Sequence, residues 1–238
     1  MKVVVPMAGR GSRFADAGID TPKPLIDVAG EPMLTWALKS LAGIENAQMI
    51  FIILREHDQK YGLAGLLREH YPDAETVLLP DVTGGQLQTV LAARDLIDSE
   101  DDLLVANCDT YLVTDLMHTI RSREPDVAGI ISVAQMPGDR WSFVRVDDQG
   151  RAVEVAEKVR ISPHASTGFY YFANGHQLVT VASDMIAHGE KTRGEYYVIP
   201  VYQKYIERGW RVTIAPVREM WDMGTPEALA AFRAHLGT

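Results

Sequence analysis

A basic, glycine-containing loop near the N-terminus is the first stretch whose residues could carry out chemistry. Gly9 and Gly11 lie beside Arg10 and Arg13, and Lys23 follows between two prolines. Glycine lets backbone N–H groups approach an anion closely, and fixed cations can bind the outer oxygens of that anion. The pattern therefore predicts a phosphate-binding loop.

The distribution of charge favours a small polyanion as the ligand of this loop. The chain has a formal net charge of −9, yet its first 24 residues hold four basic and only two acidic side chains. Cations gathered on one loop of an acidic protein focus a small anion, whereas a nucleic acid backbone would need a broad basic face. We expect no nucleic acid partner.

Two better-known glycine loops do not fit this stretch. A dinucleotide-binding G-x-G-x-x-G motif needs a third small residue where Phe14 stands, and Pro22 and Pro24 interrupt the helix that should follow. A P-loop needs G-x-x-x-x-G-K-[ST], and the sequence after Gly11 does not supply it. Both motifs are excluded.

Five motifs, in the same order along the chain, together resemble those of the sugar-1-phosphate nucleotidyltransferases. They are Gly9-x-Gly11-x-Arg13 with Pro22-Lys23-Pro24, Asn107-Cys108-Asp109, Glu157-Lys158, Ser166-Thr167-Gly168-Phe169-Tyr170-Tyr171, and Trp221-Asp222-x-Gly224-Thr225. Members of this family have a GT-A-like fold and make nucleotide sugars from an NTP and a sugar phosphate. The resemblance implies an α/β protein with a Rossmann-like, mainly parallel mixed sheet flanked by helices.

The resemblance also implies roles for individual residues. Arg13 and the amides from Gly9 to Gly11 would hold the triphosphate, Lys23 would lie across the α and leaving phosphates, and Lys158 would bind the phosphate of the acceptor. The implied nucleotide-binding residues are Ala8, Gly9, Gly11, Ser12, Gly84, Gly85 and Asn107. The implied acceptor-binding residues are Trp141, Ser142, Glu157, Ser166, Thr167 and Gly168.

Asp109 and Asp222 are the implied metal ligands, with Mg²⁺ as the cofactor. In the implied reaction a phosphate oxygen attacks the α-phosphorus of an NTP and expels pyrophosphate, which requires positioning and charge neutralisation more than covalent chemistry. Mg²⁺ suits this role because it prefers carboxylate oxygens and keeps several waters. Without the resemblance, either aspartate could equally be a turn or capping residue.

The substrates themselves stay open. Gly84-Gly85-Gln86 could admit a nucleobase or simply form a turn, and Pro80 stands where the family has a glutamine, so the NTP is undetermined, with UTP or CTP as the working expectation. Trp141-Ser142 and Asn107-Cys108 also depart from the common pattern. The acceptor could therefore be a sugar 1-phosphate, an alcohol phosphate or a phosphonate, the last two being substrates of a cytidylyltransferase.

Three alternative interpretations are weighed against this one. A GT-A glycosyltransferase would share the fold but has no use for a loop that grips a leaving pyrophosphate. A catalytically inert nucleotide-sugar sensor should have lost Lys23, Lys158 or an aspartate, and all are present. Cys108 could be a nucleophile, but a buried thiol at a strand end is the commoner case.

Composition and length indicate one ordinary globular domain over residues 1–238, with a nucleotide-binding half at about 1–125 and an acceptor-binding half at about 126–238. No apolar run approaches the ~20 residues needed to cross a bilayer, and no signal-peptide pattern is found, so we expect a cytoplasmic protein without a membrane partner. A single cysteine fits a reducing compartment. Whether the chain forms a homo-oligomer stays open.

Periodicity predicts alternating strands and helices in the first half and longer strands after residue 125. The strands are expected at 3–5, 49–54, 75–79, 102–107, 127–135, 142–147, 151–158, 166–173 and 211–217. Asp147-Asp148-Gln149-Gly150 predicts a hairpin between the strands at 142–147 and 151–158. The helices are expected at 31–42, 56–70, 86–97, 178–186 and 197–208, with a last one capped by Thr225. Strict alternation would place Glu157 and Lys158 on opposite faces, so both reach one site only if their strand ends or bulges there.

Overall fold

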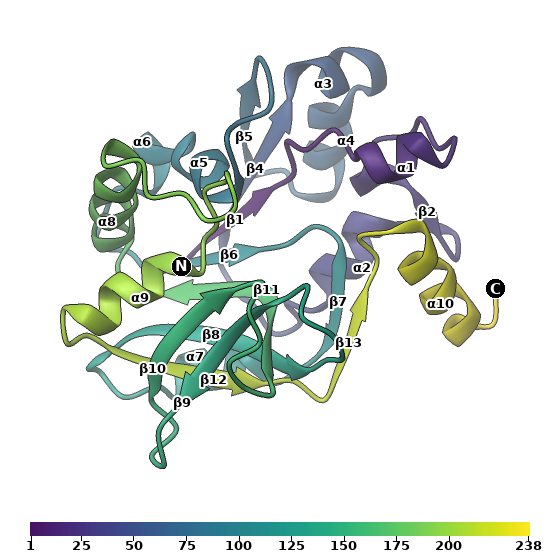
Figure 1. Ribbon diagram of the computed structural model, residues 1–238. Coiled ribbons are helices and arrows are strands. Elements are labelled where there is room, and N and C mark those ends of the chain that lie inside the picture. Colours follow the sequence, from purple (N-terminus) through teal and green to yellow (C-terminus); the bar gives the residue numbers. More distant parts are fainter.

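A nine-stranded mixed sheet forms the centre of the computed structural model, which describes residues 1–238 (Figure 1). Its parallel part has the order β6 (Leu103–Ala106), β1 (Lys2–Pro6), β4 (Gln48–Leu54), β5 (Glu75–Leu79). The antiparallel strand β11 (His164–Phe172) pairs with β6 and continues the sheet into the second half of the chain. The predicted mixed, mostly parallel sheet is confirmed.

The second half adds four strands around β11. Strands β9 (Ser142–Val146) and β10 (Ala152–Glu157) form a hairpin, as the turn residues after Val146 predict. Strand β9 pairs with one end of β11. Strand β8 (Val127–Gln135) also pairs with β11, and β12 (Arg211–Pro216) runs parallel to β8. Strand β11 thus has partners in both halves of the chain.

Helices cover both faces of the sheet, because the central strands are apolar on both sides. Val4, Ile50 and Ile52 pack in one core with α5 (Gln86–Leu91), α8 (Gly175–Ala187) and α9 (Pro200–Glu207). Val3, Val5 and Phe51 pack in a second core with α2 (Met33–Lys39), α4 (Leu63–His70) and α7 (Leu116–Arg121). Adjacent strand residues point to opposite faces, as expected of a doubly covered sheet.

Four predicted helices are shorter than expected, and one of them, predicted at 197–208, is α9, which begins only at Pro200. The helix predicted at 56–70 is two helices, α3 (Arg55–Tyr61) and α4, because Gly62 takes a left-handed conformation with φ 63° between them. The helix predicted at 86–97 is likewise α5 followed by α6 (Arg94–Ile97). The helix predicted at 31–42 begins only at Met33, since Glu31 and Pro32 form β3 with β2 (Asp27–Val28).

A two-stranded ribbon that the sequence did not predict carries the C-terminal motif to the middle of the molecule. Strand β13 (Glu219–Asp222) pairs antiparallel with β7 (Thr110–Val113), which follows Asp109 directly. In the register of this pair Asp222 lies opposite Thr110. This short strand pair therefore brings Asp222 close to Asp109, although the two residues are far apart in the sequence.

The C-terminal helix α10 (Pro226–Leu236) lies on the same side of the molecule as the short helix that follows the glycine loop (Figure 1). Thr225 caps it by accepting a hydrogen bond from the Ala228 N–H, as predicted. Phe232 and Met223 are buried with Phe14, which belongs to the short helix α1 (Ser12–Asp16) after the loop. The 3-10 turn η1 (Lys23–Leu25) then carries the proline-flanked lysine. No helix combines the length and the apolar character needed to span a membrane.

Candidate active site

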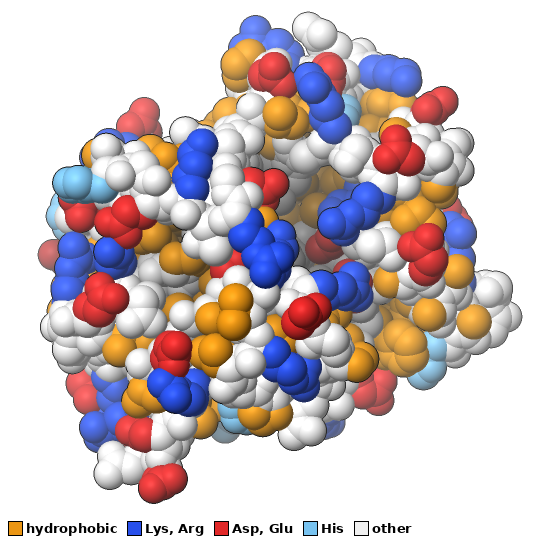
Figure 2. All heavy atoms as spheres, viewed as in Figure 1, with side chains coloured by type: hydrophobic (Ala, Val, Ile, Leu, Met, Phe, Trp, Pro, Cys, Tyr) orange, Lys and Arg blue, Asp and Glu red, His pale blue; other side chains and the backbone are white.

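Two adjoining cavities lie along the strand ends that carry the predicted site residues. The glycine-loop cavity, about 410 Å³, is lined by Ala8, Gly9, Gly84, Gly85 and Asn107 among others. The β10–β11 cavity, about 470 Å³, contains all six predicted acceptor-binding residues. The two cavities share four residues: Lys23, Gln86, Asn107 and Asp109. Figure 2 shows a hollow in the middle of this face with Lys and Arg side chains at its rim.

The basic residues of the loop differ in which cavity they line. Lys23 lines both cavities, whereas Arg13 lines only the β10–β11 cavity. Arg10 lines neither, because its side chain pairs with Glu56 at 3.3 Å and Asp81 at 2.9 Å. Gly11 and Ser12 also line neither cavity. Gly11 has φ 65° and is the N-cap residue of α1.

The glycine pair before α5 allows another segment of backbone to pass close to it. Gly85 has φ 143°, and a Cβ there would lie 2.5 Å from the backbone N and O of Tyr196. Tyr196 N donates to Gly84 O at 3.0 Å, and Leu87 N donates to Tyr196 O at 2.9 Å. Any larger residue at 85 would therefore displace the Tyr196 backbone, which directly follows the cavity-lining residues Gly194 and Glu195.

Asp109 and Lys23 form the ion pair at the junction of the two cavities, with Nζ 2.6 Å from Oδ2. Burial favours the neutral form of the Asp109 carboxyl, but the Lys23 charge and hydrogen bond outweigh it, so the pKa of Asp109 lies below its ordinary value. Burial likewise disfavours the Lys23 ammonium, but the attraction of Asp109 outweighs it and raises the pKa of Lys23. Both groups are charged at neutral pH.

Asp222 faces the same point as Asp109. A Cβ added to Gly224 would lie 2.9 Å from Asp109 Oδ2 and 3.0 Å from Asp222 Oδ1, so the two carboxylates converge on space that only a glycine leaves free. Asp222 Oδ1 accepts from Gly224 N at 2.9 Å, and Met223 N donates to Asp109 O at 2.8 Å. This fixed pair of oxygen donors fits Mg²⁺, which takes one or two carboxylates with water and phosphate oxygens.

Glu157 and Lys158 enter the β10–β11 cavity together because β10 ends between them. The strand stops at Glu157, and Lys158 has φ 53°, which turns the chain out of strict alternation. The Glu157 carboxylate, 8% exposed, accepts a hydrogen bond from the Ser142 hydroxyl. Burial raises the pKa of Glu157, although the Ser142 hydrogen bond and the Lys158 charge oppose the shift.

Asn107 and Gly168 form the wall between the cavities. Gly168 has φ 84°, where β11 shifts register, and a Cβ there would lie only 2.0 Å from Asn107 Nδ2. Asn107 N donates to Gly168 O at 3.2 Å, and Gln86 Nε2 donates to Asn107 Oδ1 at 2.6 Å. Asn107 thus lines both the glycine-loop cavity and the β10–β11 cavity. Its side chain occupies space that a side chain at position 168 would otherwise fill.

Cys108 is among the residues that line the glycine-loop cavity, but its thiol is not available as a nucleophile. Its side chain is 5% exposed and packs in the second core. Burial raises the pKa of its thiol to about 12, so almost no thiolate forms near neutral pH. The buried-thiol interpretation fits this position.

Several residues that line the β10–β11 cavity are missing from the predicted set. The most prominent are Gln86, Thr110, Arg140, Tyr170 and Tyr197. Tyr197 accepts a hydrogen bond from Lys158 Nζ, and Arg140 pairs with Asp222 at 2.7 Å. Arg140 adjoins the predicted Trp141 and could have been included on that ground. Tyr197 carries no comparable signal, because it lies 39 residues from Lys158.

The chain matches the family model described as nucleotidyl transferase over residues 2–237. It belongs to the nucleotidyl transferase family. The resemblance inferred from the five motifs is therefore confirmed.

Curated relatives and solved structures agree with this nucleotidyl transferase assignment. The chain is 26% identical to the bifunctional protein GlmU of Thermotoga petrophila over 83% of its own length, but it spans only 43% of that relative. It is 25% identical to the UTP–glucose-1-phosphate uridylyltransferase AglF of Haloferax volcanii, with 95% of this chain and 93% of that one covered. A nucleoside-diphosphate-sugar pyrophosphorylase from Vibrio cholerae superposes with a TM-score of 0.84 at 26% identity, covering 98% and 99% of the two chains.

Proposed function

We propose that this protein transfers a nucleotidyl group from an NTP to a sugar 1-phosphate or a similar small phosphorylated acceptor and releases pyrophosphate, in the synthesis of nucleotide sugars or surface-polysaccharide precursors. The observation that carries the proposal is the junction of the two cavities at Lys23 and Asp109. One cavity begins at a glycine loop suited to phosphate, and the other contains Lys158. Two polyanions can therefore meet at the shared residues.

The reaction follows from where the charges lie. Lys23, which lines both cavities, would leave its pair with Asp109 and bind the α and leaving phosphates of the NTP, and the loop amides would hold the rest of the triphosphate. Arg13 lines the β10–β11 cavity and would reach the triphosphate from that side. Lys158 binds the acceptor phosphate and aims one of its oxygens at the α-phosphorus. Once Lys23 has exchanged Asp109 for the phosphates, these cations would stabilise the charge that develops on the leaving pyrophosphate.

Asp109 and Asp222 would hold Mg²⁺. The metal would offset the negative charge of the phosphates when it is bound. No third His, Cys, Asp or Glu joins the pair, so water and phosphate oxygens would complete its coordination.

The identity of the substrates is the finer part of the proposal. UTP is supported by the relative AglF, whose printed activity is on UTP and glucose 1-phosphate and which this chain matches over nearly its whole length. CTP and a polyol phosphate form the second candidate: the buried aromatic wall of Tyr170 and the buried Glu157 would suit a hydroxylated acceptor of either kind.

A pyrophosphate-release assay tests the proposal. Four NTPs are combined with a panel of phosphorylated sugars and polyols in the presence of Mg²⁺, and release should require one NTP and one phosphorylated acceptor together. Lys23→Met should abolish release, whereas Lys60→Met, which removes an exposed lysine of α3, should not. Transfer of sugar from a nucleotide sugar to an unphosphorylated acceptor would instead identify a glycosyltransferase.

A further inference from the structure

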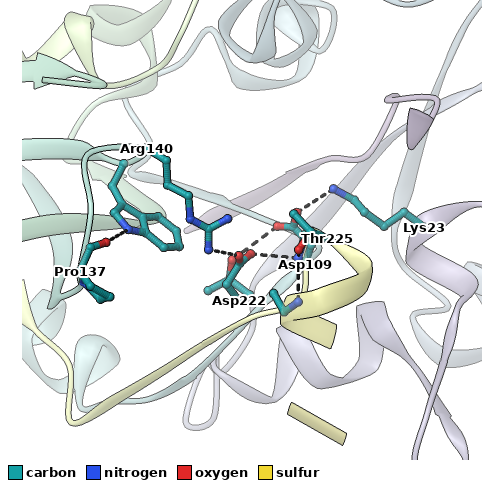
Figure 3. Close-up of polar contacts among 10 residues, drawn as sticks. Lys23, Asp109, Pro137, Arg140, Asp222 and Thr225 are labelled. Atoms are coloured by element: carbon teal, nitrogen blue, oxygen red, sulfur yellow. Dashed lines mark hydrogen bonds and ion pairs between the residues drawn. The ribbon is translucent and has the colours of Figure 1, made fainter. Parts of the chain in front are cut away.

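Arg140 reaches the carboxylate pair from the acceptor side of the site. Its Nη2 lies 2.7 Å from Asp222 Oδ2. Figure 3 shows the two carboxylates between Arg140 on one side and Lys23 on the other. Each carboxylate is thus already matched to one cation, Asp109 to Lys23 and Asp222 to Arg140. A divalent cation that binds between the carboxylates must compete with both side chains.

The two partners in the Arg140–Asp222 pair are held very differently. The Asp222 side chain is 12% exposed, and its backbone is fixed by the pairing of β13 with β7. The Arg140 side chain is 51% exposed and extends from a turn outside any helix or strand. The arginine can therefore leave into solvent at little cost, while the carboxylate stays in place.

The turn that carries Arg140 also carries Trp141 of the predicted acceptor site. The guanidinium carbon of Arg140 lies 4.1 Å from the ring centroid of Trp141. Trp141 Nε1 donates to Pro137 O at 3.1 Å, and Lys158 N donates to Trp141 O at 2.9 Å. Movement of the guanidinium away from Asp222 therefore changes the surroundings of an acceptor-side aromatic ring.

We propose that Arg140 is a resident counter-ion for Asp222, which a divalent cation displaces when it binds. This inference rests on the proposed function, because that function assigns Asp222 to the metal. Two neighbouring carboxylates repel one another, and the guanidinium offsets that repulsion before the metal binds. Displacement of Arg140 then couples occupancy of the metal position to the Trp141 wall of the β10–β11 cavity.

Direct binding of Mn²⁺ to the nucleotide-free protein, followed by electron paramagnetic resonance, tests the competition. Arg140→Gln should bind Mn²⁺ about two- to fivefold more tightly than the unmodified protein, the scale of one partly exposed ion pair. Arg140→Lys keeps the positive charge and should bind nearly as weakly as the unmodified protein. Arg145→Gln is the matched control, since Arg145 pairs with Glu154 on the β9–β10 hairpin and lines neither cavity.

An Asp222→Asn background separates failure of this inference from failure of the proposed function. The gain from Arg140→Gln should disappear when Asp222 is also replaced. If Mn²⁺ binding depends on Asp222 but Arg140→Gln leaves it unchanged or weaker, the metal assignment stands and the counter-ion role is wrong. If Asp222→Asn has no effect on Mn²⁺ binding, both are wrong.

Tryptophan fluorescence tests the coupling to the acceptor side. Mg²⁺ added to the unmodified protein should change an emission component that is absent from Trp141→Phe, because the guanidinium leaves the ring. Arg140→Gln has no guanidinium to move and should lack the same component. A Trp141 component that does not respond to Mg²⁺ in the unmodified protein would overturn the coupling.

Discussion

Lys158 and Tyr197 interact twice, through a hydrogen bond from the lysine ammonium to the phenol oxygen and through the aromatic ring, whose centroid lies 4.6 Å from Nζ. Burial raises the pKa of Tyr197, although the Lys158 hydrogen bond opposes the shift, so the phenol stays neutral near pH 7. A neutral phenol orients the ammonium without neutralising it. Lys158 is therefore held at the β10–β11 cavity by a partner that bears no charge of its own.

Tyr197→Phe keeps the ring but removes the hydrogen bond, so Lys158 should become less well oriented. We expect kcat/KM for the phosphorylated acceptor to fall about tenfold, the scale of one hydrogen bond to a charged group, with most of the loss in KM for the acceptor. Steady-state kinetics with each substrate varied in turn measure this. A rise in KM for the NTP instead would place Lys158 on the triphosphate.

Asp109→Asn and Asp222→Asn keep the shape of the carboxylate pair but remove charge. Each should lower kcat/KM by about a hundredfold or more, and the double variant should be little worse, because the two groups serve one ion. Thermal unfolding should separate the single variants. Asp109→Asn leaves the buried Lys23 without its partner and should lower Tm, whereas Asp222→Asn frees only the exposed Arg140. Losses in kcat/KM that multiply would contradict the shared-ion assignment.

Cys108→Ser should retain most of the activity, because in-line phosphoryl chemistry needs no thiol and this thiol is buried. The hydroxyl would be buried in an apolar core, so the variant should lose about 1–3 kcal/mol of stability and a few degrees of Tm. Activity and Tm are measured on the same preparation. A folded variant with activity lost by more than about a hundredfold would point to covalent catalysis.

The raised pKa of Glu157 makes a prediction about pH. A carboxyl whose pKa is higher in the folded state than in the unfolded chain costs stability once it ionises, so this cost grows as pH rises from the unfolded pKa through the folded pKa. Glu157→Gln removes the cost. The Tm of the variant relative to the unmodified protein should therefore be more favourable at about pH 8 than at about pH 4. A difference in Tm that is constant with pH would contradict the assignment of this shift to Glu157.

Local signals predicted most of the fold. The buried strand β1, the β9–β10 hairpin and the Thr225 cap depend on residues close together in sequence, and all three appear where expected. The β7–β13 pair was missed because each strand is four residues long and its partner is remote in the chain. The break at Gly62 was missed because one glycine can also be tolerated inside a helix.

The sequence could propose site residues only where a motif contains them, and it could not propose residues that the fold alone brings to the two cavities. Asp109 and Asp222 were proposed as partners from their positions at segment ends, and both carboxylates border the same space above Gly224. Arg140 lies in the turn before β9, and Tyr197 lies in the segment before α9. Both line the β10–β11 cavity, but neither belongs to a motif or a periodic sequence pattern. The sequence around a single exposed arginine or tyrosine does not show which distant residue it will contact in the folded protein.

Strand β11 restricts hinge motion between the first and second halves of the chain. It is hydrogen-bonded to β6 of the first half and to β8 and β9 of the second, so a hinge motion would have to break strand pairing. The spacing between the glycine-loop cavity and the β10–β11 cavity is therefore set by sheet register, and any change in the size of the β10–β11 cavity would come from exposed turns such as residues 136–141.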